Sequence, residues 1–345
     1  MRILALNGGS SSFKCRLDDV SADPPSAPPK PVWQASVERG ADLQKLFESL
    51  PKPVDLVGHR IVHGGKFRHS TRITAEVHAE IAREAEVAPA HNQYELEAID
   101  TVERIFNVPQ IAVFDAAFHA TLDRAAYVYP GPYEWLDQGI RRYGFHGISH
   151  QYASRRAAEI IGRTDLRLVT CHLGNGASLA AVRYGRSGDT TMGFTPLEGL
   201  MMGTRSGSID PGILIDLIRE RGYTGEQLDR VLNQESGLLG ISGISGDMRE
   251  VLAAVEAGND RARLAFEIYA HRLCREIGAM IGVLGGADAL VFTGGVGENC
   301  APLREIAQKR FAFLDAKVLV IHAEEEWEIV RECRRIADNN TVTLL

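Results

Sequence analysis

Apolar and polar positions along the chain predict buried strands that alternate with amphipathic helices. Short apolar runs near the N-terminus (RILAL) and in VPQIAVF and DALVFTGG are bounded by polar or glycine-rich turns, which is typical of strands buried in a sheet. Strands between helical segments indicate α/β layers. The predicted helices lie at about 74–88, 94–106, 211–221, 225–235, 247–256 and 259–284.

A strand–turn–strand pattern occurs twice. RILALNGGSSSFKCRL at the start and LRLVTCHLGNGASLAAVRY near the middle each place a turn rich in Gly, Ser and Asn between two apolar strands. The spacing predicts two related halves, each presenting a hairpin turn to a common ligand. A length of 345 residues also favours two domains over one core. Residues 18–53 have no periodicity and begin with DDVSADPPSAPPKP, which has five prolines, so we predict a surface loop.

Composition narrows the class of protein. With 45% hydrophobic and 24% charged residues the chain is globular. Its net charge of −7, without a basic stripe, argues against nucleic-acid binding. Five cysteines without a CxxC pair predict neither disulfides nor a cysteine zinc site and fit a reducing cytoplasm. There is no apolar run of about 18 residues, so we expect no membrane span, and the N-terminus does not resemble a signal peptide.

Glycine is clustered in turns that could bind anions. The chain lacks the P-loop string, which excludes a P-loop, and it lacks a GxGxxG after a strand, which argues against a dinucleotide-binding Rossmann site. NGGSSSFK and HLGNGAS instead offer backbone N–H groups, hydroxyls and a lysine, which suit the phosphates of a nucleotide. FTGGVGEN predicts a third turn, where an adenine could approach the backbone.

These turns occur among strings that resemble the acetokinase family of the actin, sugar-kinase and Hsp70-like ATPase superfamily. The strings run over nearly the whole chain: LALNGGSSSFK, VGHRIVHGG, APAHNQ, FDAAFHATL, YGFHGISH, HLGNGAS, DTTMGFTPLEGLMMGTRSGSIDPG, SGLLGISGISGDMRE and FTGGVGEN. The resemblance implies an α/β fold of two ribonuclease-H-like (actin-like ATPase) domains with an interdomain cleft. We expect domain I at 1–115 plus about 325–345, and domain II at about 116–324.

The same resemblance implies an activity. Family members transfer a phosphoryl group reversibly, by direct in-line transfer, between ATP and acetate, giving ADP and acetyl phosphate. They depend on Mg²⁺, for which Mn²⁺ can substitute, and they are homodimers. Another short-chain carboxylate could replace acetate. The physiological direction stays open.

Five residues match the family's catalytic positions. The resemblance implies that Arg60 binds the acyl carboxylate, that Arg205 and His146 stabilise the transferring phosphoryl group, and that His91 also lies in the active site. Guanidinium groups suit this chemistry because both reactants are anionic. For Asp115 we expect a positioning role through Mg²⁺ rather than proton transfer, since a free carboxylate, with a pKa of about 4.3, needs no base at neutral pH.

The resemblance also implies the residues that bind metal and nucleotide. Asn7 and Glu325 match the Mg²⁺ contacts, and a shift of register would put Glu324 or Glu326 in place of Glu325. His150 is interpreted as a core or helix-capping residue, whereas His59, His63 and His119 stay unassigned. The expected nucleotide contacts are Ser10, Ser12, Lys14, His172, Leu173, Gly174, Asn175, Gly176, Asp247, Met248, Arg249, Gly295, Val296, Gly297, Glu298 and Asn299.

The acyl pocket departs from the family pattern. Its matching positions are Val62, Ala90, Phe145 and Pro196, and acetate-specific members usually have Leu at the position of Ala90. Gln93 also replaces the usual proline after HN. A smaller side chain predicts a roomier pocket that accepts propionate or butyrate, although discrimination per methylene is only about 1–3 kcal/mol. The chain is also shorter than usual members, mainly in 18–53 and partly at its C-terminal end.

Two other functions share the superfamily. A sugar or polyol kinase could use Asp115 as the base for a hydroxyl group, but the acyl-kinase strings argue against it. A non-catalytic actin-like nucleotide switch would not need Arg60, His146 and Arg205 together.

Overall fold

The computed structural model describes residues 1–9, 12–38, 40–87 and 89–342, with only the backbone course given at 86–87, 89–93 and 339–342. The chain forms two compact units. The first comprises Met1–Ala120, His146–Arg156 and Glu324–Leu345, and the second comprises Thr121–Phe145 and Ala157–Ala323. The expected division placed 146–156 in the second domain. That segment packs in the first unit instead, where the N–H of Gly147 donates to the Asp115 carbonyl oxygen over 3.0 Å.

The first unit is built on a mixed sheet with strand order β3-β2-β1-β4-β6-β5. The strands are β1 (Arg2–Gly8), β2 (Ser12–Asp19), β3 (Trp33–Glu38), β4 (Leu56–Ile61), β5 (Thr71–Arg72) and β6 (Gln110–Phe114). β1 and β2 form an antiparallel hairpin, whereas β1, β4 and β6 run parallel. The two strands predicted beside the polar turn are thus β1 and β2, and further apolar runs form β4 and β6.

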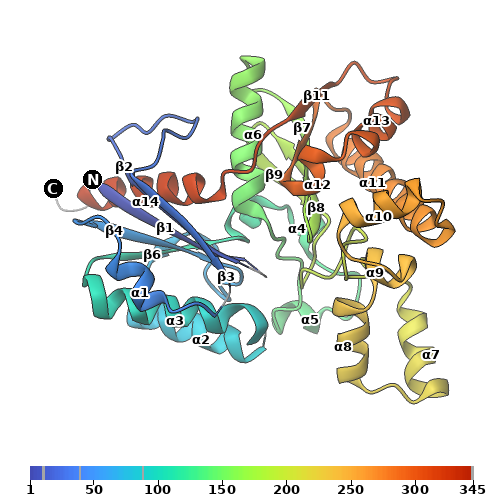
Figure 1. The fold of residues 1–345 in the computed structure, drawn as a ribbon, viewed down its shortest axis with the longest axis horizontal. Coiled ribbons are helices and arrows are strands. Elements are labelled where there is room, and N and C mark those ends of the chain that lie inside the picture. Colours follow the sequence, from blue (N-terminus) through green and yellow to red (C-terminus); the bar gives the residue numbers. More distant parts are fainter. Residues whose placement is uncertain (10–11, 39, 88, 343–345) are drawn as a thin grey trace. The chain divides into compact units, whose positions relative to one another are not determined.

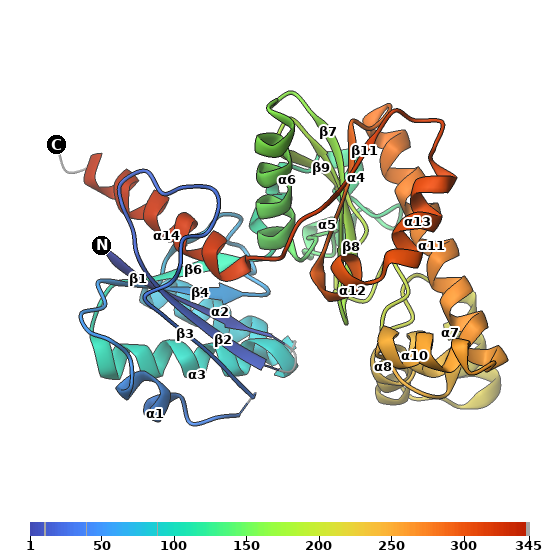
Figure 2. The ribbon, with the colours of Figure 1, turned by 45° about the horizontal axis from the view of Figure 1, so that its top comes forward.

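Helices cover both faces of this sheet. α1 (Leu43–Glu48), α2 (Ala75–Val87) and α3 (Pro89–Phe106) lie on one face, and α14 (Glu325–Val342) lies on the other (Figures 1 and 2). α14 approaches β4 closely, because a Cβ at Gly58 would lie 2.3 Å from the Cys333 sulfur. α6 (Gly147–Ile161) begins in this unit.

The second unit has a sheet of order β11-β10-β7-β8-β9. The strands are β7 (Arg167–Leu173), β8 (Ala177–Arg183), β9 (Arg186–Thr190), β10 (Ala289–Thr293) and β11 (Lys317–Val320). The long helix α11 (Asp260–Leu284) packs along β7, β8 and β9. The other helices are α4 (Arg124–Tyr127), α5 (Glu134–Asp137), α7 (Pro211–Arg221), α8 (Gly225–Gln234), α9 (Gly237–Ser242), α10 (Met248–Glu256), α12 (Gly294–Asn299) and α13 (Ala301–Arg310).

The predicted repeat is confirmed at the level of topology. In each sheet the first strand pairs antiparallel with the second, the second pairs antiparallel with the third, and the first pairs parallel with the fourth. The hairpins β1–β2 and β7–β8 therefore occupy equivalent places in their units. Helix α7 and helix α8 form a hairpin at the far end of the second unit from β11 (Figure 1).

Two local predictions are wrong. Residues 18–53 are not one loop, because they contain β3 and α1. β3 is a sheet-edge strand, and α1 has only six residues, capped by Asp42, so neither is long enough to give a clear period. The expected turn FTGGVGEN is the end of β10 followed by the short helix α12. Among the described residues, no helix is long and apolar enough to cross a membrane.

Candidate active site

The carboxyl ends of three neighbouring parallel strands gather the central charged residues of the first unit. Asn7 lies near the end of β1, Arg60 near the end of β4, and Asp115 directly after β6. The register aligns Arg60 with Val113, and the Asp115 N–H donates to the Ile61 carbonyl oxygen over 2.9 Å. Functional side chains of α/β folds commonly occupy this edge of a sheet.

Arg60 and Asp115 form a two-point ion pair. Arg60 Nε donates to Asp115 Oδ1 over 3.1 Å and Nη2 donates to Oδ2 over 2.6 Å. The side chains are only 12% and 2% exposed. Burial lowers the pKa of Arg60, but Asp115 and Glu325 outweigh it and raise this pKa above its ordinary value. Arg60 is therefore a fixed cation whose remaining nitrogen, Nη1, donates to Asn7 Oδ1 over 3.1 Å.

The start of α14 decides which acids face Asn7. Asn7 Nδ2 donates to Glu325 Oε2 over 2.9 Å and to Glu326 Oε1 over 2.6 Å. Glu324 instead pairs with the buried Arg16 over 3.2 Å. Of the three registers left open by the sequence, the structure thus places 325 and 326 beside Asn7.

These groups fit a divalent cation of the hard type. The carboxylates of Glu325 and Glu326 face the amide nitrogen of Asn7, and the amide oxygen of Asn7 faces Arg60. Together with Asp115, these acids carry more negative charge than the single Arg60 cation balances. Over the described ranges, no three His, Cys, Asp or Glu side chains come close enough to hold a metal by themselves. Mg²⁺ suits such a sparse set, because it keeps several of its waters.

His146 has a backbone conformation that points to a special role. Its φ of 56° lies in the left-handed region, which is uncommon for residues other than glycine and clusters at functional sites. The next residue, Gly147, contacts the Asp115 carbonyl oxygen so closely that a Cβ would lie 2.0 Å from it. Sequence and backbone together therefore hold the start of α6 beside Asp115.

Four further histidines of the first unit make contacts within the fold. His150 and His119 are fully buried, with ring centroids 5.7 Å apart, in agreement with the interpretation of His150 as a core residue. The His59 ring nitrogen lies 2.7 Å from Gln110 Oε1, and burial lowers its pKa to about 4, although this hydrogen bond acts in the opposite direction. His63 lies 2.9 Å from Glu84.

The first hairpin turn is described in part. The Gly9 N–H donates to the Ser12 carbonyl oxygen over 2.8 Å, and Lys14 is exposed on β2 opposite Asn7. Ser10 lies outside the described residues, as do the side chains of Ala90 and His91. Val62 of the expected acyl pocket is buried, and its N–H donates to Glu95 over 3.4 Å. Glu95 is a buried acid that sequence reasoning missed, because a single Glu in an amphipathic helix gives no signal.

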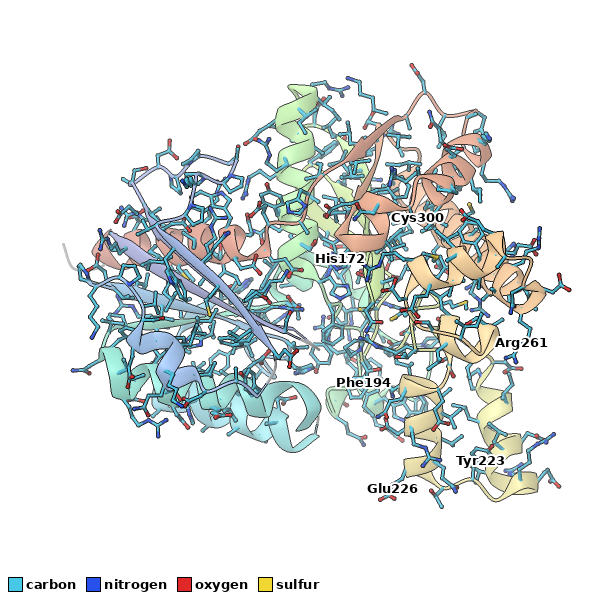
Figure 3. All side chains as sticks on the ribbon, viewed as in Figure 1. His172, Phe194, Tyr223, Glu226, Arg261 and Cys300 are labelled. Atoms are coloured by element: carbon cyan, nitrogen blue, oxygen red, sulfur yellow. The ribbon has the colours of Figure 1, made fainter. Side chains whose placement is uncertain are left out.

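The second hairpin turn uses backbone rather than charge. The Gly174 N–H donates to the Gly176 carbonyl oxygen over 2.9 Å, and the Gly203 N–H donates to the Asn175 carbonyl oxygen over 3.1 Å. A Cβ at Gly203 would lie 2.3 Å from Asn175 Oδ1. His172, next to last in β7, lies far from the α7–α8 tip marked by Tyr223 and Glu226 (Figure 3).

Arg205 is a half-buried cation in this second unit. Its Nη1 donates to the Pro196 carbonyl oxygen over 2.9 Å, which brings a predicted catalytic residue next to a predicted pocket residue. Burial lowers the pKa of Arg205. Within the part of the chain that the structure describes, no carboxylate forms an ion pair with Arg205. A guanidinium group in this setting is suited to receive an anion.

The expected adenosine contacts lie in two places. Asp247 caps α10 and pairs with the exposed Arg249 over 2.5 Å, whereas Met248 is buried. In α12, Glu298 accepts from the N–H groups of Gly294 and Ala323, each over 3.0 Å. The Glu298 side chain therefore fixes the local fold. Gly295 and Asn299 are the exposed residues of that helix, while Leu173 and Gly297 are buried.

Comparisons with known proteins agree with one another. A model of the acetokinase family matches residues 41–326. An acetate kinase of Cyanothece sp. is 49% identical over 99% of this chain and 100% of its own length. Another, of Gloeobacter violaceus, is 51% identical over 96% of this chain and 98% of its own. The first alignment runs over 406 positions, so gaps in these 345 residues occupy part of it.

Solved structures give the same result. The crystal structure of Porphyromonas gingivalis acetate kinase is 35% identical, covers 97% of this chain and 99% of its own, and has a TM-score of 0.86. A propionate kinase of Francisella tularensis matches with the same identity, coverage and TM-score. A putative N-acetylmannosamine kinase of Listeria monocytogenes, 12% identical over 96% of this chain and 99% of its own with a TM-score of 0.52, shares the fold alone.

Proposed function

Because the chain belongs to the acetokinase family, we propose that it is an acetate kinase, which transfers a phosphoryl group reversibly between ATP and acetate. The observation that carries this proposal is the identity of 49% and 51% to acetate kinases along nearly the whole chain. The charged cluster at the edge of the first sheet supports it, because that cluster suits two anionic reactants and a cation.

The reaction needs positioning more than proton transfer. A carboxylate oxygen of acetate attacks the γ-phosphorus, the new O–P bond forms, and the bond from phosphorus to the leaving oxygen of ADP breaks. In this proposal Arg60 binds the carboxylate, while Arg205 and His146 stabilise charge on the transferring group. Asp115 orients Arg60 through their two-point pair rather than acting as a base.

We place Mg²⁺ at the groups around Asn7. When bound, the metal neutralises charge on the ATP phosphates. Glu325 and Glu326 both qualify as ligands, directly or through water, because both contact Asn7, whereas Glu324 is paired with Arg16. Asp115 stays a positioning group beside them.

ATP binding is assigned to the two hairpin turns and to α10 and α12. Ser12 and Lys14 flank the first turn, 174–176 form the second, and 247–249 and 295–299 are the proposed adenosine contacts. The second turn offers backbone groups, which bind phosphate oxygens without adding charge.

The preferred acid has a second candidate. The solved acetate kinase and the solved propionate kinase match this chain equally well, so overall likeness does not choose between acids. Ala90, at a position where acetate-specific members usually have Leu, favours a larger acid such as propionate or butyrate. Steady-state kcat/KM with acetate, propionate and butyrate decides between them.

We further propose a cytoplasmic homodimer. Three isoleucines of α7, Ile213, Ile215 and Ile218, are 48%, 49% and 51% exposed, and this helix buries none of its residues in its own unit. Ile215 and Ile218, three positions apart, lie on one side of the helix, and exposed apolar side chains that adjoin in this way favour association. The five free, buried cysteines fit a reducing compartment. Light scattering of the wild type and of Ile215→Asp tests the dimer, which the variant should weaken.

Hydroxamate capture of acyl phosphate tests the main proposal. Purified protein with ATP, Mg²⁺ and acetate should give product, and chelation of Mg²⁺ should abolish it. Absence of product with acetate, propionate and butyrate alike would reject the acyl-kinase function and would favour a sugar kinase or a nucleotide switch.

A further inference from the structure

A compact polar cluster surrounds the loop that carries Pro196 and Arg205. At its centre Arg142 Nη1 donates to three successive carbonyl oxygens, those of Thr190, Thr191 and Met192, over 3.1, 3.2 and 3.0 Å. Its Nη2 donates to Glu198 Oε1 over 2.7 Å. One guanidinium group therefore binds both ends of the segment 190–198.

Tyr129 completes the cluster from a third part of the chain. Its hydroxyl donates to Glu198 Oε2 and accepts from the Phe194 N–H over 2.8 Å. The Arg142 guanidinium also lies over the Tyr129 ring, 5.6 Å from the centroid. Figure 3 labels Phe194 in this loop. Six hydrogen bonds of Arg142 and Tyr129 thus converge on the segment 190–198, on its backbone and on the Glu198 carboxylate.

Gly193 leaves the space in which the side chains of Tyr129 and Glu198 meet. A Cβ there would lie 1.7 Å from Glu198 Oε2 and 2.1 Å from the Tyr129 hydroxyl, so only glycine allows the two side chains to meet. The Gly193 carbonyl oxygen in turn accepts from the N–H groups of Tyr143 and Gly144 over 3.0 and 3.3 Å. The chain then continues directly into Phe145 and His146.

One hydrogen bond connects the segment held by the cluster to a proposed catalytic residue. Pro196 lies between Phe194 and Glu198, and its carbonyl oxygen accepts from Arg205 Nη1 over 2.9 Å. A displacement of 192–198 therefore moves both a wall of the proposed acyl pocket and the anchor of the proposed catalytic arginine.

We infer that Arg142, Glu198 and Tyr129 are positioning residues, which set the rate and the acid selectivity of the proposed acyl kinase by fixing the loop that bears Pro196 and Arg205. This inference rests on the proposed function for its kinetic consequence, but not for its structural one. Misplacement of a positioning group by about 1 Å can cost about 100-fold in rate.

The variants separate positioning from folding. Arg142→Met removes all four hydrogen bonds of the guanidinium group, whereas Arg142→Lys keeps the charge but not the fork. Tyr129→Phe removes one hydroxyl and is the variant most certain to fold. Arg230→Met is the matched control, since Arg230 forms an exposed ion pair with Glu235 in the same unit, 2.9 Å apart.

Kinetics gives the first readout. We expect kcat/KM for acetate to fall about 10- to 100-fold in Arg142→Met and about 3- to 10-fold in Tyr129→Phe, with a changed ratio of acetate to propionate and a smaller change in KM for ATP. Arg142→Lys should recover part of the loss. A role in stability alone would lower the active fraction and leave the acid ratio and both KM values as they are, which would overturn the inference.

Hydrogen exchange of the full-length protein gives the second readout, which needs no activity. Amides of 192–205 should exchange faster in Arg142→Met and Tyr129→Phe than in the wild type or Arg230→Met. Unchanged exchange there would overturn the positioning role even if the enzyme is active. If the two variants exchange faster but the wild-type protein has no acyl kinase activity, the proposed function is rejected and the positioning role in the loop is retained.

Discussion

The two units share the order of five strands, to which the first adds β5, but they present different chemistry at equivalent edges of their sheets. In the first, the ends of β1, β4 and β6 carry Asn7, Arg60 and Asp115, whose side chains bond to one another. In the second, β7 and β10 run into Gly174 and Gly294, and the contacts there are largely between backbone groups. A repeated scaffold thus fixes where loops emerge, while their residues fix what they bind.

This difference matches two halves of one reaction. A carboxylate and a metal need charged side chains held in register, whereas a nucleotide also needs close approach of backbone N–H groups. Arg205 is the exception in the second unit, since it is a half-buried cation among glycine-rich segments.

Removal of the Arg205 side chain should have the largest effect. Arg205→Ala deletes a cation that we assign to the transferring phosphoryl group, so kcat should fall about 1000-fold, while the Kd for ATP changes little. Steady-state kinetics and calorimetric ATP titration measure the two quantities. Turnover near the wild-type level in Arg205→Ala, or an equal loss in Arg230→Ala, would contradict the role that we assign to Arg205.

The second-largest effect should be a loss of stability at low pH that originates in the first unit. His59, on β4 of the first unit, is buried and its pKa is lowered to about 4, so it stays neutral in the folded protein while the unfolded chain gains a proton below pH 6.5. Stability from this group is present above pH 6.5 and is lost as pH falls towards 4, by up to about 3 kcal/mol.

Urea unfolding between pH 7 and 4.5 measures this loss. His59→Gln should reduce the acid dependence, whereas His69→Gln, a change at an exposed position of the same unit, should not. Parallel acid slopes for the wild type and His59→Gln would contradict the prediction.

Asp115→Asn tests whether the first unit depends on charge. The substitution keeps the shape of the side chain but removes the carboxylate that holds Arg60 at two points. We expect kcat/KM for acetate to fall about 100-fold, chiefly through a misplaced Arg60. Because no proton transfer is involved, the shape of the pH–rate profile should persist. Loss of an ionisation from that profile would instead indicate a base.

Gly203→Ala tests the backbone character of the second unit and should have the smallest effect. The added Cβ would lie 2.3 Å from Asn175 Oδ1 and 2.8 Å from the Gly246 carbonyl oxygen, so the turn 174–176, to which we assign phosphate binding, must shift. We expect KM for ATP to rise about tenfold with a smaller change in KM for acetate. Gly225→Ala, where a Cβ meets open space, is the control. Equal increases in both KM values would remove the distinction between the units.

The sequence could predict the elements and the residue types of the site, but not which side chains pair with one another. The strands before Asp115 and Gly294 are long apolar runs, and the motifs around Arg60 and Arg205 are local, so both are visible in one dimension. The pairing of Arg60 with Asp115 depends on strand register, which relates residues 55 positions apart. For the same reason the meeting of Tyr129, Arg142 and Glu198 has no signature in the sequence.

The short elements inside 18–53 were missed for another reason. β3 lies at the edge of its sheet and alternates only between half-buried and exposed positions, and α1 buries just Leu43 and Phe47. Such segments are stabilised by tertiary contacts more than by their own pattern.

The position of Trp327 has an experimental consequence. This indole is 1% exposed, lies 5.4 Å from the Arg16 guanidinium group and directly follows Glu325 and Glu326. Trp135 is 42% exposed and Trp33 is half-buried. In a Trp33→Phe, Trp135→Phe background, the protein should keep a single tryptophan, which lies beside its proposed cation ligands. Emission would then follow the arrival of Mg²⁺ in real time, without a coupled assay or an added dye.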